Sequence, residues 1–198
     1  SSDGTKADIY SRVAGAAMDA MMADIRAGKA DPDIANFWLQ YGVSRSLAKK
    51  PVMTYLYGAV QAAASTYIED KIAEEGGWPD DFDRGPACTY MASKLFHGIE
   101  QAVPAACALM RWLRKLPHKV GNRPILWTTP SGFPVWHDYR QFELKRVEIR
   151  SCGMQKVSVR IYKDDIDVIR SRNAISPNFV HSLDACHVTL VADQFYKR

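Results

Sequence analysis

The chain has 198 residues, of which 47% are hydrophobic, so it is long and apolar enough to bury a core. Its composition is not that of a disordered chain, and we expect one domain or one large piece of a bigger enzyme. The net charge of +4 and a pI near 8.8 are compatible with a polyanionic partner. No apolar run approaches the roughly 20 residues that span a bilayer, so we expect a cytoplasmic protein without a membrane contact.

The four cysteines are far apart and form no C-x-x-C pair, which argues against a zinc ribbon and a disulfide framework. We expect all of them to be reduced thiols. They are Cys88, Cys107, Cys152 and Cys186.

Residues 1–42 are expected to form N-terminal helices. Apolar residues recur at helical intervals from Asp8 to about Ala27. Gly28 to Pro32 breaks this pattern, and a second, short helix is predicted from Ile34 to Tyr41.

The segment 43–75 is expected to hold two helices, and the first carries four residues spaced by four: Arg45, Lys49, Met53 and Tyr57. At about 100° per residue these side chains share one broad face. A planar guanidinium and a compact ammonium suit phosphates, the phenol adds a hydroxyl, and Gly58 permits close approach to the backbone. The ordinary alternative is the solvated face of an amphipathic helix.

Proline residues mark two interruptions in the helical part of the chain. Pro51 lies inside the first helix of 43–75 and predicts a kink or break between Lys50 and Val52. A helix over 59–75 follows, and the segment 86–119 is predicted to be helical with a bend at Pro104.

The segment 125–163 changes character, because β-prone runs at Ile125–Thr129 and Val135–Tyr139 are separated by turn residues. Residues 142–150 and 155–163 then alternate apolar and polar side chains, as in a β-hairpin. Such a cationic two-stranded ribbon has the width of a DNA major groove. A solvent-facing hairpin with ordinary surface charge is the alternative.

A last helix over 176–198 is predicted to begin with Ser176 as its N-cap and Pro177 in its first turn. His181, Asp184 and His187 are spaced by three and lie near one face. A hydrogen-bonded structural cluster or a substrate-contacting cluster is favoured over a metal site, because the segment has one carboxylate and no cysteine at ligand spacing.

Three of these segments also resemble motifs of one family, the single-subunit RNA polymerases of bacteriophages and mitochondria. The string Arg-xxx-Lys-xxx-Met-Thr-xx-Tyr-Gly, from Arg45 to Gly58, resembles the family's fingers helix. The run Trp127–Trp136 resembles the motif before the promoter specificity hairpin, and Pro-Asn-Phe-Val-His-Ser-x-Asp, from Pro177, resembles the segment joining fingers to palm. The resemblance extends from about Asp8 to the C-terminus and implies a mainly α fold with a small β part (α+β), a helical fingers subdomain carrying a β-hairpin.

The resemblance implies roles for the residues that match. Arg45 and Lys49 would hold a ribonucleoside triphosphate and neutralise charge as pyrophosphate leaves, with Met53 and Gly58 beside them. Tyr57 and His181 would sense the 2′-hydroxyl, so Lys49, Tyr57 and His181 are the expected catalytic residues. The residues expected to read promoter bases are Arg146, Glu148, Lys156 and Ser158.

Nucleotidyl transfer also needs Mg²⁺ ions held by carboxylates. The family's palm aspartates lie in motifs that these residues do not contain, and the two acidic clusters, 80–83 and 164–167, are typical of solvated turns. We therefore expect no metal site here and no RNA synthesis by this chain alone. Its expected partners are promoter DNA, the template strand, ribonucleotides and the palm, thumb and N-terminal parts of the polymerase. A non-catalytic DNA-binding module and a DNA polymerase relative are the alternatives.

Overall fold

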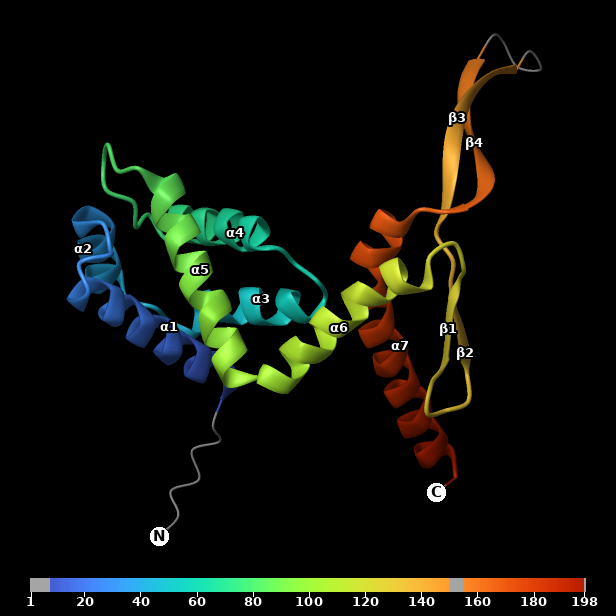
Figure 1. The fold of residues 1–198 in the computed structure, drawn as a ribbon. Coiled ribbons are helices and arrows are strands. Elements are labelled where there is room, and N and C mark those ends of the chain that lie inside the picture. Colours follow the sequence, from blue (N-terminus) through green and yellow to red (C-terminus); the bar gives the residue numbers. More distant parts are fainter. Residues whose placement is uncertain (1–7, 150–154, 198) are drawn as a thin grey trace. The chain divides into compact units, whose positions relative to one another are not determined.

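The computed structural model describes residues 8–149 and 155–197. The chain divides into two compact units, the first extending through Met110 and the second beginning at Arg111, inside a helix. Helices dominate, and the strands form two small antiparallel hairpins, so the predicted α+β class is confirmed (Figure 1). Among the described residues no helix combines the length and the apolar character that crossing a membrane requires.

The first unit is entirely helical in its described part, and its helices are coloured blue to green in Figure 1. They are α1 (Ile9–Arg26), α2 (Pro32–Tyr41), α3 (Arg45–Leu56), α4 (Gln61–Glu74), α5 (Arg84–Ala102) and the start of α6 (Pro104–Val120). The predicted bend at Pro104 is a complete break, because Val103 separates α5 from α6.

Helix α5 lies at the centre of the first unit and contacts α1, α3 and α4. Its apolar face, which includes Met91, Leu95 and Ile99, is fully buried. Gly98 lets α1 approach closely, since a Cβ atom at this position would lie 2.7 Å from the carbonyl oxygen of Val13. The fit between α1 and α5 therefore depends on the missing side chain.

An aromatic cluster attaches α2 to the rest of the first unit. The Trp38 side chain is fully buried, and its Nε1 donates to the carbonyl of Ala87 at 3.1 Å. The ring of Phe37 stacks on Trp78, with 5.0 Å between centroids, and lies 4.8 Å from Phe82. These contacts join the loop before α5 to α2.

The sequence predicted a kink or a break at Pro51. The break is wrong, because α3 runs without interruption from Arg45 to Leu56, and the kink stays a prediction. Pro51 has no N–H to donate to Leu47, a loss that usually destabilises a helix interior. Here Pro51 is buried together with Leu47 and Val52, so tertiary packing offsets the lost hydrogen bond.

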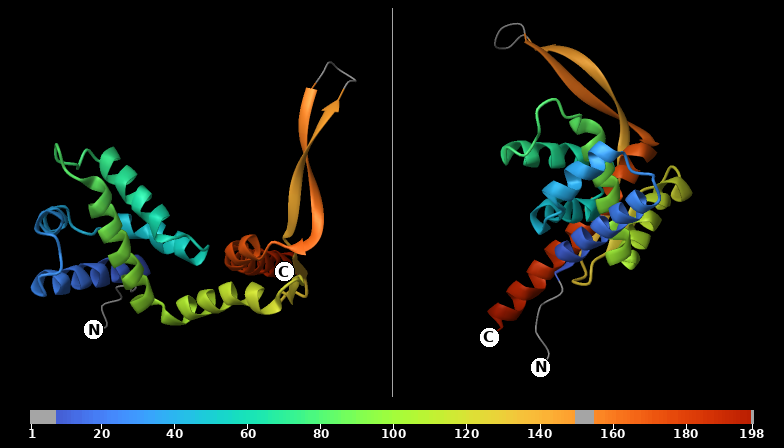
Figure 2. Two further views of the ribbon diagram at one scale, coloured as in Figure 1. Left: turned by 45° about the horizontal axis from the view of Figure 1, so that its top comes forward. Right: turned by 90° about the vertical axis from the view of Figure 1, so that its left-hand side faces the viewer.

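The second unit contains two hairpins and one long helix. The strands are β1 (Ile125–Thr128), β2 (Pro134–His137), β3 (Arg140–Ile149) and β4 (Gln155–Ile166), and the helix is α7 (Val168–Tyr196). Strand β3 pairs with β4, the hairpin that the sequence predicted, and β1 pairs with β2, which the sequence had indicated only as two separate strands. In every view the β3–β4 ribbon extends away from α7 and from β1–β2 (Figures 1 and 2).

The predicted start of the last helix at Ser176 is wrong, because α7 begins at Val168. Asp167 is its N-cap, and the Asp167 carboxylate accepts a hydrogen bond from the backbone N–H of Arg170 at 2.9 Å. Ser176 and Pro177 therefore lie inside the helix. The Ser-Pro pair is typical of a helix start, but here the helix has already begun at the Asp167 cap, nine residues before Ser176.

We expect Gly98→Ala to lower the free energy of unfolding by about 1–3 kcal/mol, because the new Cβ must push α1 away from α5. Gly15→Ala is the matched control, since a Cβ atom at this position of α1 would have no neighbour within 4 Å and alanine favours the helix by about 0.5–1 kcal/mol. Urea unfolding of both variants measures the two effects. Equal stability of the two variants would contradict the close packing of α1 and α5.

Candidate functional site

Helix α3 separates its side chains into a buried face and an exposed face. Leu47, Ala48, Pro51 and Val52 are buried, and α3 contacts α1, α4 and α5. The four residues that the sequence placed on one face, Arg45, Lys49, Met53 and Tyr57, are all exposed. The helical spacing and the burial pattern therefore agree for Arg45, Lys49 and Met53, whereas Tyr57 is the C-cap just after the helix.

Arg45, in the first turn of α3, is held by the start of α1. Its Nε donates to the Asp8 carboxylate, and its guanidinium carbon lies 5.1 Å from the centroid of the Tyr10 ring. Partial burial opposes ionisation of Asp8, but the hydrogen bonds from Arg45 and from the Tyr10 N–H outweigh it and lower the pKa of this carboxyl. No motif or spacing in the sequence had indicated this contact.

The two neighbouring lysines of α3 differ in their surroundings. The Nζ of Lys50 lies 4.3 Å from the centroid of the Tyr67 ring on α4, a cation–π contact. Lys49 is exposed, and within the described part of the chain no ion pair or ring contact engages it. Both lysines are exposed, and Lys49 is the one whose charge no described neighbour engages.

Tyr57 and Gly58 end α3 in a compact C-terminal motif. The N–H of Ala59 donates to the carbonyl of Thr54 at 3.0 Å, and the N–H of Gly58 donates to the carbonyl of Tyr55 at 2.9 Å. This pair of bonds is the Schellman pattern, which needs a positive φ, and Gly58 has φ 86°. The ring of Tyr55 also packs edge-on against Phe96 of α5, with centroids 5.0 Å apart. The backbone that carries Tyr57 is therefore firmly placed.

His181 belongs to the second unit and Tyr57 to the first, so the convergence of their side chains stays a prediction. His181 lies on the exposed side of α7 with Asp184 and His187. No group of three or more His, Cys, Asp or Glu side chains in the described ranges has the arrangement of a metal site. Cys88, Cys107 and Cys186 are buried free thiols, and Cys152 lies outside the described residues.

The β3–β4 ribbon brings the four residues predicted to contact DNA onto one face. Arg146 is opposite Ser158, and Glu148 is opposite Lys156. The Lys156 Nζ lies 3.7 Å from the Glu148 carboxylate, and both side chains are exposed. The opposite face carries exposed apolar residues, Val147, Val157, Val159 and Ile161. The turn predicted at 151–154 and Arg150 lie outside the described residues.

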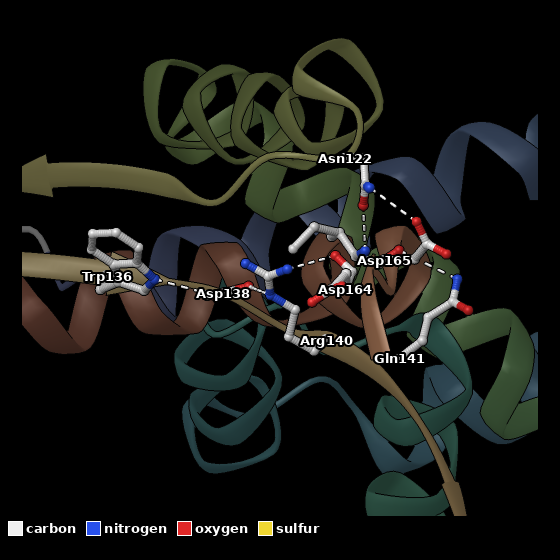
Figure 3. A network of polar contacts seen from close by, with 8 residues as sticks. Asn122, Trp136, Asp138, Arg140, Gln141, Asp164 and Asp165 are labelled. Atoms are coloured by element: carbon white, nitrogen blue, oxygen red, sulfur yellow. Dashed lines mark hydrogen bonds and ion pairs between the residues drawn. The ribbon is translucent and has the colours of Figure 1, made fainter. Parts of the chain in front are cut away.

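Polar contacts tie the base of this ribbon to the rest of the second unit (Figure 3). The Arg140 Nε donates to the Asp138 carboxylate at 2.7 Å, and Arg140 also donates to the carbonyl of Asp164. Asn122 accepts from the N–H of Ile166 and donates to the Asp165 carboxylate at 3.0 Å. The prediction of a solvated turn at 164–167 is therefore wrong, because Asp164 and Asp165 lie in β4 and the carboxylates of Asp165 and Asp167 accept structural hydrogen bonds.

A buried polar network joins β2 to α7 beneath the ribbon. The side chain of His137 is 2% exposed, and its Nδ1 accepts from the Asn178 amide at 3.2 Å. The neutral ring therefore carries its proton on Nε2, which donates to the carbonyl of Ser171 at 3.1 Å. The Trp127 Nε1 donates to Ser182 at 3.0 Å. Burial lowers the pKa of His137.

The sequence of this chain is similar to those of known proteins along most of its length. The whole chain, residues 1–198, matches the family model described as DNA-dependent RNA polymerase. A DNA-directed RNA polymerase of Pseudomonas phage phiKMV is 35% identical over 193 residues, which cover 94% of this chain and 24% of the relative. DNA-directed RNA polymerase 1B, mitochondrial, of Nicotiana tabacum is 34% identical, covering 94% of this chain and 19% of the relative. The DNA-directed RNA polymerase of Enterobacteria phage T3 is 32% identical, over 79% of this chain and 20% of the relative.

We expect the stability of the second unit to fall as the pH drops below 6.5, the usual pKa of histidine. Because the folded state holds His137 neutral, the unfolded state binds the extra proton first and is favoured by acid. Unfolding at pH 7.5 and 5.5, with an NMR titration of the imidazole, measures the effect. A His137→Gln variant should lose this part of the pH dependence. An imidazole that titrates at or above 6.5 would contradict the assignment.

Proposed function

Because the chain belongs to the DNA-dependent RNA polymerase family, we propose that it forms the fingers part of such an enzyme, which binds and selects the incoming ribonucleotide and reads promoter DNA. The chain spans between 18% and 24% of the length of most of the curated relatives it matches. The activity of a complete polymerase therefore depends on further parts as well. The chain alone is not expected to synthesise RNA.

The observation that carries this proposal is the exposed face of α3. With its Nε paired to Asp8, Arg45 offers two terminal NH2 groups in a planar fork, and Lys49 offers a mobile point charge one turn away. A triphosphate carries several negative charges within a short distance, so both cations can pair with it at once. When pyrophosphate leaves, the same positive charges stabilise the developing negative charge.

Selection of the sugar is assigned to Tyr57 and His181. A hydroxyl and an imidazole placed at the 2′ position expect a hydrogen-bonding partner. A deoxyribonucleotide leaves these groups unpaired, which costs binding free energy and disfavours the wrong sugar. The exposed phenol at the fixed end of α3 supports this role.

Promoter reading is assigned to the polar face of the β3–β4 ribbon. The register supports it, because Arg146, Glu148, Lys156 and Ser158 lie in two adjacent cross-strand pairs. Arg and Lys pair with guanine edges and Glu with the cytosine amine, so four such side chains in a major groove read a short sequence. The Glu148–Lys156 ion pair is exposed and weak, so DNA can displace it.

Other parts of the polymerase are the proposed partners for magnesium binding and for packing. Asp165 accepts from the Asn122 amide and Asp167 caps α7, so both carboxylates have structural roles in the second unit. We propose that Mg²⁺ is bound by aspartates outside this chain. Helix α7 also exposes apolar side chains that its own unit leaves uncovered, among them Val188, Leu190 and Phe195.

In the polymerase that contains this chain, Lys49→Ala should raise the KM for ribonucleotides and lower kcat by about 10-fold or more, because one transition-state charge contact is lost. Lys50→Ala is the matched control, because the Lys50 ammonium contacts the Tyr67 ring of α4 and has no proposed role in nucleotide binding. Steady-state RNA synthesis measures both. Equal kinetics of the two variants would refute the role of Lys49.

Arg146→Ala should weaken binding to the cognate promoter and relax the preference at one base pair, at a cost of about 1–3 kcal/mol. Lys145→Ala removes a cation from the opposite face of the same strand and should weaken all duplexes equally. Competition binding at fixed salt compares the variants. Loss of binding without change in sequence preference for Arg146→Ala would favour a DNA-binding module without promoter recognition.

A further inference from the structure

Asp8 has two structural roles in the first unit. Its carboxylate is the N-cap of α1, accepting from the Tyr10 N–H at 3.3 Å and from the Ser11 hydroxyl at 3.2 Å. The same carboxylate accepts from the Nε of Arg45, 37 residues later, in α3. Since the cap fixes the Asp8 side chain at the start of α1, the carboxylate is a rigid point of attachment for Arg45.

The contact with Asp8 leaves the phosphate-binding edge of the guanidinium open. Only Nε pairs with Asp8, and within residues 8–149 and 155–197 neither terminal nitrogen of Arg45 has a hydrogen-bonding partner. The guanidinium lies over the Tyr10 ring at 5.1 Å, which restricts its plane. The Arg45 side chain is 56% exposed, so the open edge is accessible to a ligand.

We infer that Asp8 is a positioning residue for ribonucleotide binding, which holds the Arg45 fork in the orientation that receives the triphosphate, with Tyr10 as its stacking platform. The inference rests on the proposed function of Arg45. An arginine side chain has many rotamers, and fixing it before the ligand arrives removes part of the entropy cost of binding. Asp8 acts through Arg45 and does not itself contact the nucleotide.

A negative charge beside a phosphate site also has an opposing effect. Asp8 repels the triphosphate, but its charge is compensated by the direct pair with Arg45, and the surroundings are partly exposed to water, which screens the remainder. We therefore expect the gain from orientation to exceed the repulsion. A carboxylate that merely competed with the triphosphate for Arg45 would produce the opposite result.

The test is the variant Asp8→Asn in the polymerase that contains this chain. Asparagine is as good an N-cap as aspartate, so α1 keeps its start while the charged contact with Arg45 is lost. The KM for ribonucleotides should rise about threefold to tenfold and kcat should fall by a smaller factor, because Arg45 is held less firmly both on the bound triphosphate and on the leaving pyrophosphate. In an Arg45→Ala background, Asp8→Asn should have no further effect on KM.

Asp31→Asn is the matched control, because Asp31 caps α2 through the N–H groups of Asp33 and Ile34 and does not contact Arg45. It should leave KM unchanged. If Arg45→Ala raises KM and Asp8→Asn does not, the inference about Asp8 fails alone. If Asp8→Asn lowers KM, Asp8 competes with the nucleotide and the inference is overturned. If Arg45→Ala itself leaves KM unchanged, the proposed function of Arg45 fails first.

Discussion

The packing of one face of α3 against its neighbouring helices is the constraint on which the proposed nucleotide site depends. Leu47, Ala48 and Val52 are buried, so the helix cannot rotate without exposing them. The same constraint keeps Pro51 inside a continuous helix despite its missing N–H. Arg45, Lys49 and Met53, which are spaced by four on the opposite side of α3, are therefore held facing solvent together.

A corresponding constraint acts on the ribbon of the second unit. A two-stranded hairpin is at best marginally stable by itself, so the direction of the β3–β4 ribbon depends on how its base is attached. Arg140, Asn122 and the buried His137 supply that attachment through hydrogen bonds to β4 and α7. The guanidinium of Arg170 also lies over the Tyr139 and Phe142 rings, at 5.2 and 5.7 Å. Side chains far along the ribbon are placed by contacts at its base.

Periodicity predicted what depends on local spacing, and it could not predict what depends on distant contacts. The shared face of Arg45 and Lys49 and the pairing of Arg146 with Ser158 follow from helical and strand repeats. The start of α7 was mistaken because Ser176-Pro177 is a local signal that the earlier Asp167 cap overrides. The Asp8–Arg45 pair and the His137–Asn178 bond join residues 37 and 41 positions apart, and no spacing in the chain signals either contact.

We propose that the exposed end of α3 recognises the sugar of the incoming ribonucleotide. Tyr57→Phe removes one hydroxyl and retains the ring, so the ratio of kcat/KM for GTP to that for dGTP in the polymerase carrying this variant decides the matter. We expect this ratio to fall by about 10-fold or more, because the 2′-hydroxyl loses its partner. A ratio equal to that of the unaltered enzyme would contradict it.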